Sequence, residues 1–305
     1  MKRVLITTSS FGKEDTSVIN MLYDRGYEVT FNPYGRKLTE AEVSHLIKEV
    51  KPIGIIAGTE TLTGRVLSDI PSLKVISRCG IGLDNVDLDA AGKKGITVTN
   101  TPDGPSRAVA ELTVGLILAA LRNIPRSDAS IRAGGWKRPM GKLLGEQTVG
   151  IVGCGRIGTA VGHLISSFGA RVYGYDPYIT EHLTLRLVSL SKLLKSADII
   201  SLHLPYDSSV YHMVDIHFMQ NMKKGSLLVN TSRGGIVDEQ ALYAAIKAEQ
   251  LAGACIDTFE NEPYDGPLAK LPQVVLTPHF GSYAREARIK MEEEAVANLL
   301  SILKE

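Results

Sequence analysis

Three side chains that could move a proton or hold an anion follow three predicted strands in the second half of the chain. They are Arg233, Glu262 and His279. The planar guanidinium of an arginine can hold a carboxylate and polarise a carbonyl group. A histidine is the usual proton donor or acceptor near neutral pH, and a neighbouring carboxylate fixes its tautomer. Each residue alone has an ordinary interpretation as a solvated or structural side chain, but their joint placement at successive strand ends favours a catalytic set.

A glycine-rich turn earlier in the chain predicts a cofactor site that would act together with these three residues. Residues 149–152 are typical of a short buried strand, and Gly153, Gly155 and Gly158 follow in the spacing G-x-G-x-x-G before an apolar-periodic helix. A second predicted strand then ends at Asp176. In this context the glycine N–H groups and the helix N-terminus hold a pyrophosphate, and the acid binds the ribose hydroxyls of NAD. Both sets of residues together predict hydride transfer with a nicotinamide cofactor.

The composition is that of an ordinary globular protein. The chain has 305 residues, 44% of them apolar and 22% charged, with a net charge of +1. Bulk charge therefore predicts neither a nucleic-acid nor a membrane surface, although a small anionic substrate needs only a local cluster. The three cysteines, Cys79, Cys154 and Cys255, are far apart and odd in number, so we expect neither a disulfide framework nor a metal site, and a cytoplasmic location. The longest apolar run, residues 114–121, is too short to span a bilayer.

Predicted strands and helices alternate along the whole chain, which indicates parallel sheets covered by helices on both faces. A turn-rich stretch at residues 100–105 is interpreted as a hinge before a long helix at 106–121. We therefore expect an α/β protein with two doubly wound parallel-sheet domains. A Rossmann cofactor domain, residues 100–285, is inserted in a smaller flavodoxin-like substrate domain, residues 1–99 and 286–305, with the site in a cleft between them.

The first domain offers a candidate anion loop after a predicted strand. Arg78 precedes Cys79, Gly80 and Ile81, and glycines in such a turn expose N–H groups that can form an anion-binding nest. An ordinary glycine turn is the alternative. Cys79 is interpreted as a small packing residue rather than a nucleophile. The only tryptophan, Trp136, is either an exposed loop tip or an anchor against a second subunit.

The chain resembles the D-isomer-specific 2-hydroxyacid dehydrogenases over nearly its whole length, and within that family the phosphoglycerate dehydrogenases most. The matching segments are residues 78–87, 100–102, 153–158, 175–177, 233–239, Asp257 with 262–263, and 278–279. The resemblance implies NAD-dependent interconversion of a D-2-hydroxy acid and its 2-keto acid. It points to oxidation of 3-phosphoglycerate to 3-phosphohydroxypyruvate in serine biosynthesis, and to a homodimer or a tetramer.

The resemblance also assigns roles to individual residues. Arg233, Glu262 and His279 match the family's Arg-Glu-His catalytic set. The backbone of residues 79–81 matches the substrate-carboxylate loop, and Arg78 matches a phosphate-side arginine. The further cofactor contacts that it implies are Arg156, Ile157, Pro177, Leu204, Pro205, Thr231, Ser232 and Asp257, the last on the nicotinamide amide.

Two departures from the family pattern keep other interpretations open. Many phosphoglycerate dehydrogenases carry a further arginine where this chain has residues 57–60, Ala-Gly-Thr-Glu, which favours a glyoxylate, hydroxypyruvate or other 2-keto-acid reductase as the alternative. The chain also stops after its closing helix, so regulation through a C-terminal domain is not expected. From another class, some relatives are NAD-sensing corepressors that bind partner peptides, and a complete catalytic set does not exclude that role.

Overall fold

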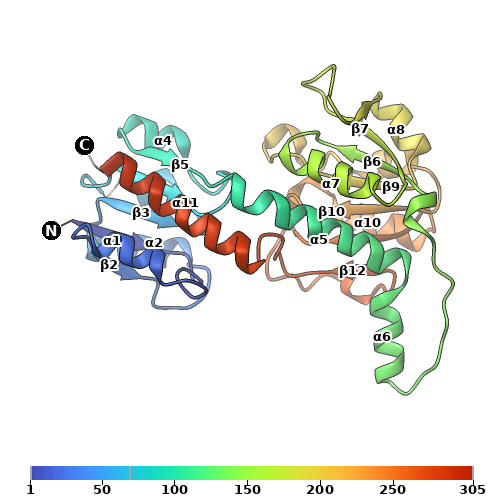
Figure 1. The fold of residues 1–305 in the computed structure, drawn as a ribbon, viewed down its shortest axis with the longest axis horizontal. Helices are drawn as coiled ribbons and strands as arrows, with labels where there is room; N and C mark the ends of the chain where they lie inside the picture. Colours follow the sequence, from blue (N-terminus) through green and yellow to red (C-terminus); the bar gives the residue numbers. More distant parts are fainter. Residues whose placement is uncertain (1, 69, 304–305) are drawn as a thin grey trace. The chain divides into compact units, whose positions relative to one another are not determined.

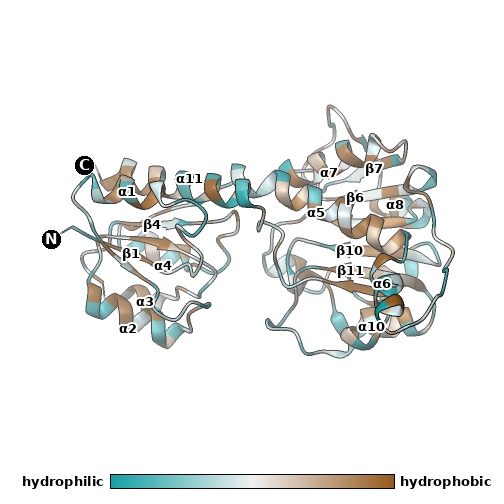
Figure 2. Ribbon diagram, turned by 60° about the horizontal axis from the view of Figure 1, so that its bottom comes forward, coloured by the Kyte–Doolittle hydropathy of each residue, from teal (hydrophilic) through white to brown (hydrophobic). Residues whose placement is uncertain are grey.

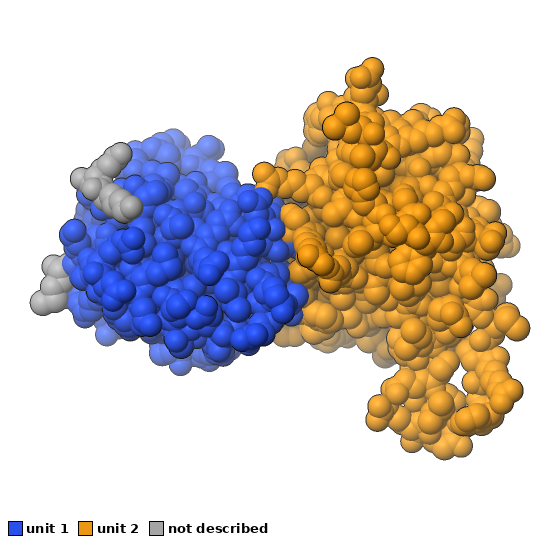
Figure 3. Space-filling model, in the orientation of Figure 1, with its two compact units in different colours: residues 1–105, 282–305 blue, residues 106–281 orange. Residues whose placement is uncertain are grey.

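The computed structural model describes residues 2–68 and 70–303, and the chain divides into two compact units. Unit 1 comprises residues 1–105 and 282–305, and unit 2 comprises residues 106–281 (Figure 3). Unit 2 is therefore an insertion in unit 1. The sequence predicts boundaries at 99/100 and 285/286, whereas the units divide at 105/106 and 281/282.

Unit 1 is built on a five-stranded parallel sheet. The sheet has the order β2-β1-β3-β4-β5, and every neighbouring pair is parallel. This is the flavodoxin-like order, so the predicted fold class of this part is confirmed. The strands are β1 (Arg3–Ile6), β2 (Glu28–Phe31), β3 (Gly54–Ala57), β4 (Val75–Arg78) and β5 (Thr97–Thr99) (Figure 1).

Helices cover both faces of this sheet because successive strand residues point to opposite sides. Leu5 belongs to the core cluster shared with α2, α3 and α4, whereas Val4 and Ile6 belong to the cluster shared with α1 and α11. Helix α2 begins with a capping box, in which Thr39 and Glu42 each accept from the other's backbone N–H. The helices are α1 (Ser17–Tyr23), α2 (Glu40–Val50), α3 (Gly64–Ser68), α4 (Leu88–Lys93) and α11 (Arg285–Leu303).

Unit 2 is built on a seven-stranded parallel sheet of the order β12-β11-β10-β9-β6-β7-β8. The chain builds β7 and β8 on one side of β6 and β9 to β12 on the other. The direction reverses between β6 and β9, and ligands of such sheets bind outside the carboxyl ends of the strands at this point. The strands are β6 (Thr148–Val152), β7 (Arg171–Tyr175), β8 (Arg186–Leu187), β9 (Ile199–Leu202), β10 (Ser226–Asn230), β11 (Leu251–Ile256) and β12 (Val274–Leu276).

Helices also cover both faces of the second sheet. One core cluster joins α8, α9 and α10 to the strands, and another joins α5 and α7 to the opposite face. Figure 2 shows hydrophobic residues along the strands that these helices cover. The helices are α5 (Asp103–Leu121), α6 (Ile124–Arg132), α7 (Arg156–Ser166), α8 (Leu190–Ser196), α9 (Ile216–Asn221) and α10 (Glu239–Lys247), with short 3-10 turns η1 (Leu144–Glu146), η2 (Ser208–Val210), η3 (Gly234–Ile236) and η4 (Pro267–Lys270).

Helix α5 starts three residues earlier than the sequence predicts, because Pro105 stands in the first turn, where a helix does not need its missing N–H. It is the one helix in the described ranges that is long and apolar enough to cross a membrane, with a mean hydropathy of 1.3, and half of that window is buried. Ala110, Val114 and Ile117 belong to the core cluster that also contains residues of β6 and α7. Packing within unit 2 accounts for its apolar side chains.

Candidate active site

The glycine turn lies at the switch point of the second sheet. Gly153 has a φ of +92°, and a Cβ on it would overlap the carbonyl oxygen of His203, which follows β9. A Cβ on Gly158 would overlap the carbonyl oxygen of Gly153, so this glycine lets α7 pack against the turn. Gly155 differs from both, because nothing in the described protein lies within 4 Å of where its Cβ would be. The missing side chain of Gly155 therefore leaves open space for a ligand beside the helix N-terminus.

Asp176 follows β7 and is held beside this turn. One carboxylate oxygen accepts from the N–H of Cys154 at 3.0 Å, and the other accepts from the N–H of Tyr178 at 3.0 Å. The cap residue of α7 is Gly155, which has no side chain that could bind the N–H groups at the helix N-terminus. A helix N-terminus with an acid fixed beside it fits the pyrophosphate and ribose of a dinucleotide.

The other predicted cofactor residues lie at the ends of neighbouring strands. Leu204 and Pro205 follow β9, and Thr231 and Ser232 follow β10. The Thr231 hydroxyl is buried and bonded to the hydroxyl of Thr113 on α5 at 2.9 Å. Ser232 donates through both its N–H and its hydroxyl to the side-chain oxygen of Asn230. These bonds hold the turn that leads to Arg233.

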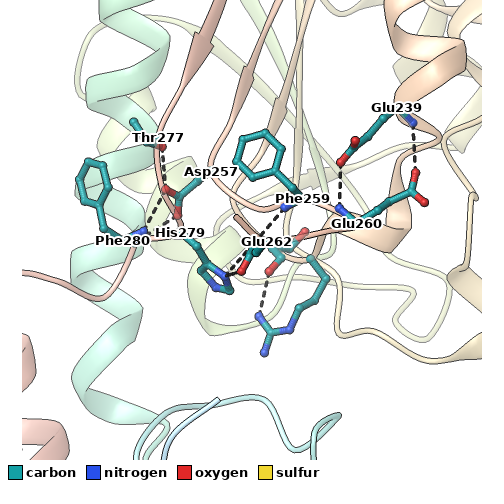
Figure 4. Close-up of polar contacts among 11 residues, drawn as sticks. Glu239, Asp257, Phe259, Glu260, Glu262, Thr277, His279 and Phe280 are labelled. Carbon is teal, nitrogen blue, oxygen red and sulfur yellow. Dashed lines mark hydrogen bonds and ion pairs between the residues drawn. The ribbon is translucent and has the colours of Figure 1, made fainter. Parts of the chain in front are cut away.

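His279 and Glu262 meet, although they come from different loops. Nδ1 of His279 lies 2.9 and 3.0 Å from the two carboxylate oxygens of Glu262 (Figure 4). Because a carboxylate only accepts, Nδ1 carries the hydrogen, and Nε2 is the nitrogen left for proton exchange. Both side chains are about one-third exposed, at 37% and 32%, so a substrate can reach them. This is the arrangement of a general acid–base with its orienting carboxylate.

Asp257, at the end of β11, holds the turn that carries His279. Its carboxylate accepts from the Thr277 hydroxyl at 2.6 Å and from the Phe280 N–H at 3.1 Å (Figure 4). It also accepts from the Gly281 N–H at 3.0 Å. His279 itself has a φ of +52°, which a non-glycine residue rarely adopts without such support. Burial raises the pKa of Asp257 above its ordinary value, and the hydrogen bond from Thr277 offsets only part of this rise.

Arg233 lies in the turn after β10, where its guanidinium donates to the carbonyl of Ser232 at 2.8 Å. The next residue, Gly234, is buried, and a Cβ on it would overlap the peptide between Phe259 and Glu260. The turn of Arg233 is therefore pressed against the loop that carries Glu262. All three predicted catalytic residues lie in unit 2 at the same edge of one sheet.

Comparison with known proteins identifies this unit. Residues 114–281 match the family model described as D-isomer specific 2-hydroxyacid dehydrogenase, NAD binding domain. The chain belongs to this family. The matched segment contains the glycine turn, Asp176 and the three predicted catalytic residues, and NAD as the cofactor of the family agrees with the prediction from Asp176.

Two curated relatives and one solved structure show the range of the likeness. A D-3-phosphoglycerate dehydrogenase of Methanocaldococcus jannaschii is 43% identical over 259 residues, covering 82% of this chain and 49% of that protein. A glyoxylate reductase of Thermofilum pendens is 41% identical over 259 residues, covering 81% of this chain and 76% of that protein. The crystal structure of the TT0316 protein from Thermus thermophilus superposes with a TM-score of 0.91 at 37% identity, covering 99% and 97% of the two chains. The chain spans about half the length of the phosphoglycerate dehydrogenases that it matches.

The candidate anion loop lies in unit 1. Arg78 is buried at 9% exposure, and its guanidinium folds back over Gly80 and donates to the carbonyl of Cys79. The N–H of Cys79 donates to Ala57, and that of Gly80 donates to Thr101. The N–H groups of Cys79 and Gly80, two of the three expected to bind an anion, therefore already donate hydrogen bonds within the chain. The amide of Ile81, for which no such bond is found in the described residues, remains as the candidate donor of this loop.

Several buried titratable groups fit a structural role better than a chemical one. Burial raises the pKa of the Cys79 and Cys154 thiols to about 11 and also raises that of Cys255. Such thiols stay protonated near neutral pH, which agrees with the interpretation of Cys79 as a packing residue. Burial lowers the pKa of His203 to about 3, so this histidine is neutral. Within residues 2–68 and 70–303, no group of three or more His, Cys, Asp or Glu side chains could hold a metal ion.

The sequence does not assign roles to Glu239, Glu260 or Thr277. Glu239 and Glu260 bind each other's backbone, and Thr277 binds Asp257. The position of Glu239 in the first turn of a helix could have indicated a contact with backbone N–H groups, because such helix ends favour acidic side chains. Its partner is 21 residues away, and the sequence carries no sign of that pairing.

Proposed function

We propose that this chain is an NAD-dependent dehydrogenase that interconverts a D-2-hydroxy acid and its 2-keto acid. The observation that carries the proposal is the contact of His279 with Glu262 at the carboxyl edge of an NAD-binding sheet. It supplies a proton donor and acceptor beside the place where ligands of such sheets bind. Arg233, in the neighbouring turn, supplies the cation that a 2-keto carboxylate needs.

The roles of the residues follow from their chemistry. NAD, when bound, supplies or accepts the hydride. In reduction, the guanidinium of Arg233 holds the substrate carboxylate and polarises the keto oxygen, and protonated His279 gives its Nε2 proton to that oxygen. Glu262 holds Nδ1–H and stabilises the imidazolium before the transfer. In oxidation His279 starts neutral. Its Nε2 takes the proton of the substrate hydroxyl as the hydride leaves the carbon that bears this hydroxyl.

For the substrate, we propose 3-phosphoglycerate and its product 3-phosphohydroxypyruvate, which would place the enzyme in serine biosynthesis. The support is the 43% identity with a phosphoglycerate dehydrogenase and the presence of Arg78 beside the anion loop.

A glyoxylate or hydroxypyruvate reductase is the second candidate, and one observation favours it. Glu60 stands in the segment where many phosphoglycerate dehydrogenases carry a further arginine. Its buried carboxylate binds the Thr7 hydroxyl and, at 3.0 Å, the N–H of Gly58. A buried carboxylate repels a phosphate nearby. The 41% identity with a glyoxylate reductase agrees with this alternative.

A panel of keto acids separates these candidates. The purified protein is assayed by NADH oxidation with phosphohydroxypyruvate, hydroxypyruvate, glyoxylate and pyruvate, and the His279→Asn variant is the control. The proposal requires turnover that falls by about 10²-fold or more in the variant. The highest kcat/KM for phosphohydroxypyruvate supports the first substrate, and the highest value for glyoxylate or hydroxypyruvate supports the second. NADH binding without turnover of any keto acid would instead favour the NAD-sensing binding protein.

We also propose that the enzyme is a homodimer in the cytoplasm. The support for self-association is the set of exposed apolar side chains on α6 and the segment after it. These are Ile124 (54%), Ile131 (57%), Trp136 (76%), Met140 (94%) and Leu143 (65%). Exposed aromatic and aliphatic residues gathered on one segment are typical of interfaces.

Analytical ultracentrifugation tests the dimer. The double variant Trp136→Ser, Leu143→Ser should sediment as a monomer, whereas Leu183→Ser, at an exposed leucine elsewhere in unit 2, should not change the mass. A monomeric wild type would refute the dimer. The support for the cytoplasm is the three unpaired thiols, and cell fractionation tests it.

A further inference from the structure

Two glutamates link the helix after Arg233 to the loop before Glu262. The N–H of Glu260 donates to a carboxylate oxygen of Glu239 at 2.8 Å, and the N–H of Glu239 donates to a carboxylate oxygen of Glu260 at 3.3 Å. Figure 4 shows this reciprocal pair beside the contact of Glu262 with His279. Each glutamate thus fixes the backbone of the other.

The peptide between Phe259 and Glu260 stands between this pair and the proton-transfer residues. Gly234, next to Arg233, lies against this peptide so closely that a Cβ would overlap it. The N–H of Phe259 donates to a carboxylate oxygen of Glu262 at 3.1 Å, and the same oxygen accepts from Nδ1 of His279. A shift of the backbone at Phe259 and Glu260 would therefore move Glu262 relative to both His279 and Arg233.

Two neighbouring carboxylates normally repel each other, but the helix end compensates for this here. Glu239 is the first residue of α10, whose cap is Asp238, and the positive end of a helix favours nearby negative charge. Nε2 of His212 lies 3.1 Å from a carboxylate oxygen of Glu260, and its backbone N–H donates to Gly235 at 2.8 Å. Burial raises the pKa of Glu239, and the hydrogen bond from the Glu260 N–H opposes part of this rise.

We propose that Glu239 and Glu260 are positioning residues that hold the Glu262–His279 pair in register with Arg233. This inference rests on the proposed dehydrogenase function and assigns no contact with substrate or cofactor to either residue. It is the reach of the Glu239 carboxylate to the Glu260 N–H that matters, and not its charge.

Three variants separate reach from charge. Glu239→Asp keeps the charge but withdraws the carboxylate by one methylene, whereas Glu239→Gln keeps the reach and an acceptor oxygen. We expect Glu239→Asp to lower kcat by about tenfold, because a misplacement of about 1 Å costs this much or more, with the KM for NADH nearly unchanged. Glu239→Gln should restore most of kcat. Glu286→Asp, the same change in the first turn of α11 in unit 1, is the matched control and should leave kcat unchanged.

A double variant shows whether Glu239 acts through Glu262. In the Glu262→Gln background, where the charged orienting group is already lost, Glu239→Asp should lower kcat by less than about twofold. Thermal melting of all variants serves as the measure of stability. A purely structural role would give the same factor in both backgrounds, together with a matching fall in melting temperature.

An NMR titration of His279 reads the same geometry without turnover. Its ring signals, among those of seven histidines, are identified by their loss in His279→Asn. We expect the titration in Glu239→Asp to move from the wild-type midpoint toward that of Glu262→Gln, and that in Glu239→Gln to stay with the wild type. Equal midpoints for wild type and Glu239→Asp, or equal kcat for the Asp and Gln variants, would overturn the inference. A wild type without keto-acid turnover would refute the proposed function, and the titration would still decide the positioning role.

Discussion

Nδ1 of His279 lies 2.9 Å from one carboxylate oxygen of Glu262 and 3.0 Å from the other. The histidine adopts a φ of +52° to make this contact, and Asp257 holds the turn on its other side. Glu262 therefore meets a ring whose backbone turn is already held by Asp257. The contact leaves Nε2 as the only ring nitrogen that can exchange a proton with a substrate.

Removing the charge of Glu262 should change the pH dependence of the reaction. Reduction requires protonated His279, and the carboxylate stabilises that form. In Glu262→Gln the loss of reductive activity with rising pH should therefore begin at lower pH than in the wild type. The measurement is the pH profile of kcat/KM for keto-acid reduction. Coinciding profiles would show that Glu262 is not the functional partner of His279.

Asp176 should make this chain prefer NADH over NADPH. Its carboxylate is fixed by the N–H groups of Cys154 and Tyr178, so it cannot easily turn away from a 2′-phosphate. Juxtaposed like charges cost several kcal/mol, and we expect kcat/KM for NADH to exceed that for NADPH by about 10²-fold. Asp176→Ser should reduce this ratio at least tenfold. A wild type that uses both cofactors equally would contradict this role.

Two glycines of the same turn should fail in different ways when each is replaced by alanine. Nothing described lies within 4 Å of the Cβ position of Gly155, so Gly155→Ala should melt like the wild type but raise the KM for NADH about tenfold, because the methyl group occupies the space of the pyrophosphate. Gly158→Ala places a methyl group against the carbonyl oxygen of Gly153. Overpacking of this kind costs about 1–3 kcal/mol, so its melting temperature should fall by about 5 °C. Calorimetry and NADH saturation curves check the pair, and equal melting temperatures would contradict the packing role of Gly158.

His203 should make unit 2 sensitive to acid. Burial lowers its pKa to about 3 in the folded chain, whereas an unfolded chain binds the proton near pH 6.5. Stability from this group is fully present above about pH 6.5 and is lost as the pH falls toward 3, because only the unfolded state takes up the proton. Between pH 6.5 and 5 the wild type should lose about 2 kcal/mol more free energy of unfolding than His203→Gln. Urea unfolding followed by circular dichroism measures this, and parallel pH dependences would exclude the assignment.

Local patterns in the sequence were enough to predict the fold class and most elements. The strand predicted at residues 149–152 overlaps β6 (Thr148–Val152), and the long helix predicted at 106–121 overlaps α5 (Asp103–Leu121). Their signals are apolar periodicity and flanking glycines, which act within one strand or a few helical turns. The two-residue strand β8 (Arg186–Leu187) was not predicted, because so short a segment has no period.

The amino-acid sequence by itself also determined which residue types could form the site and that they follow strands. It named Glu262 as the partner of His279, but whether Glu262 or its neighbour Glu260 reaches the ring depends on contacts outside their loop. The tertiary structure decides it. The carboxylate of Glu260 accepts from the N–H of Glu239, the first residue of α10. The turn held by Asp257 places His279 in contact with Glu262. The sequence likewise could not show that the amides of Cys79 and Gly80 are already engaged, since their acceptors are Ala57 and Thr101. Hydrogen bonds between residues this far apart depend on how strands are ordered in a sheet, and that order is fixed only when the whole domain packs.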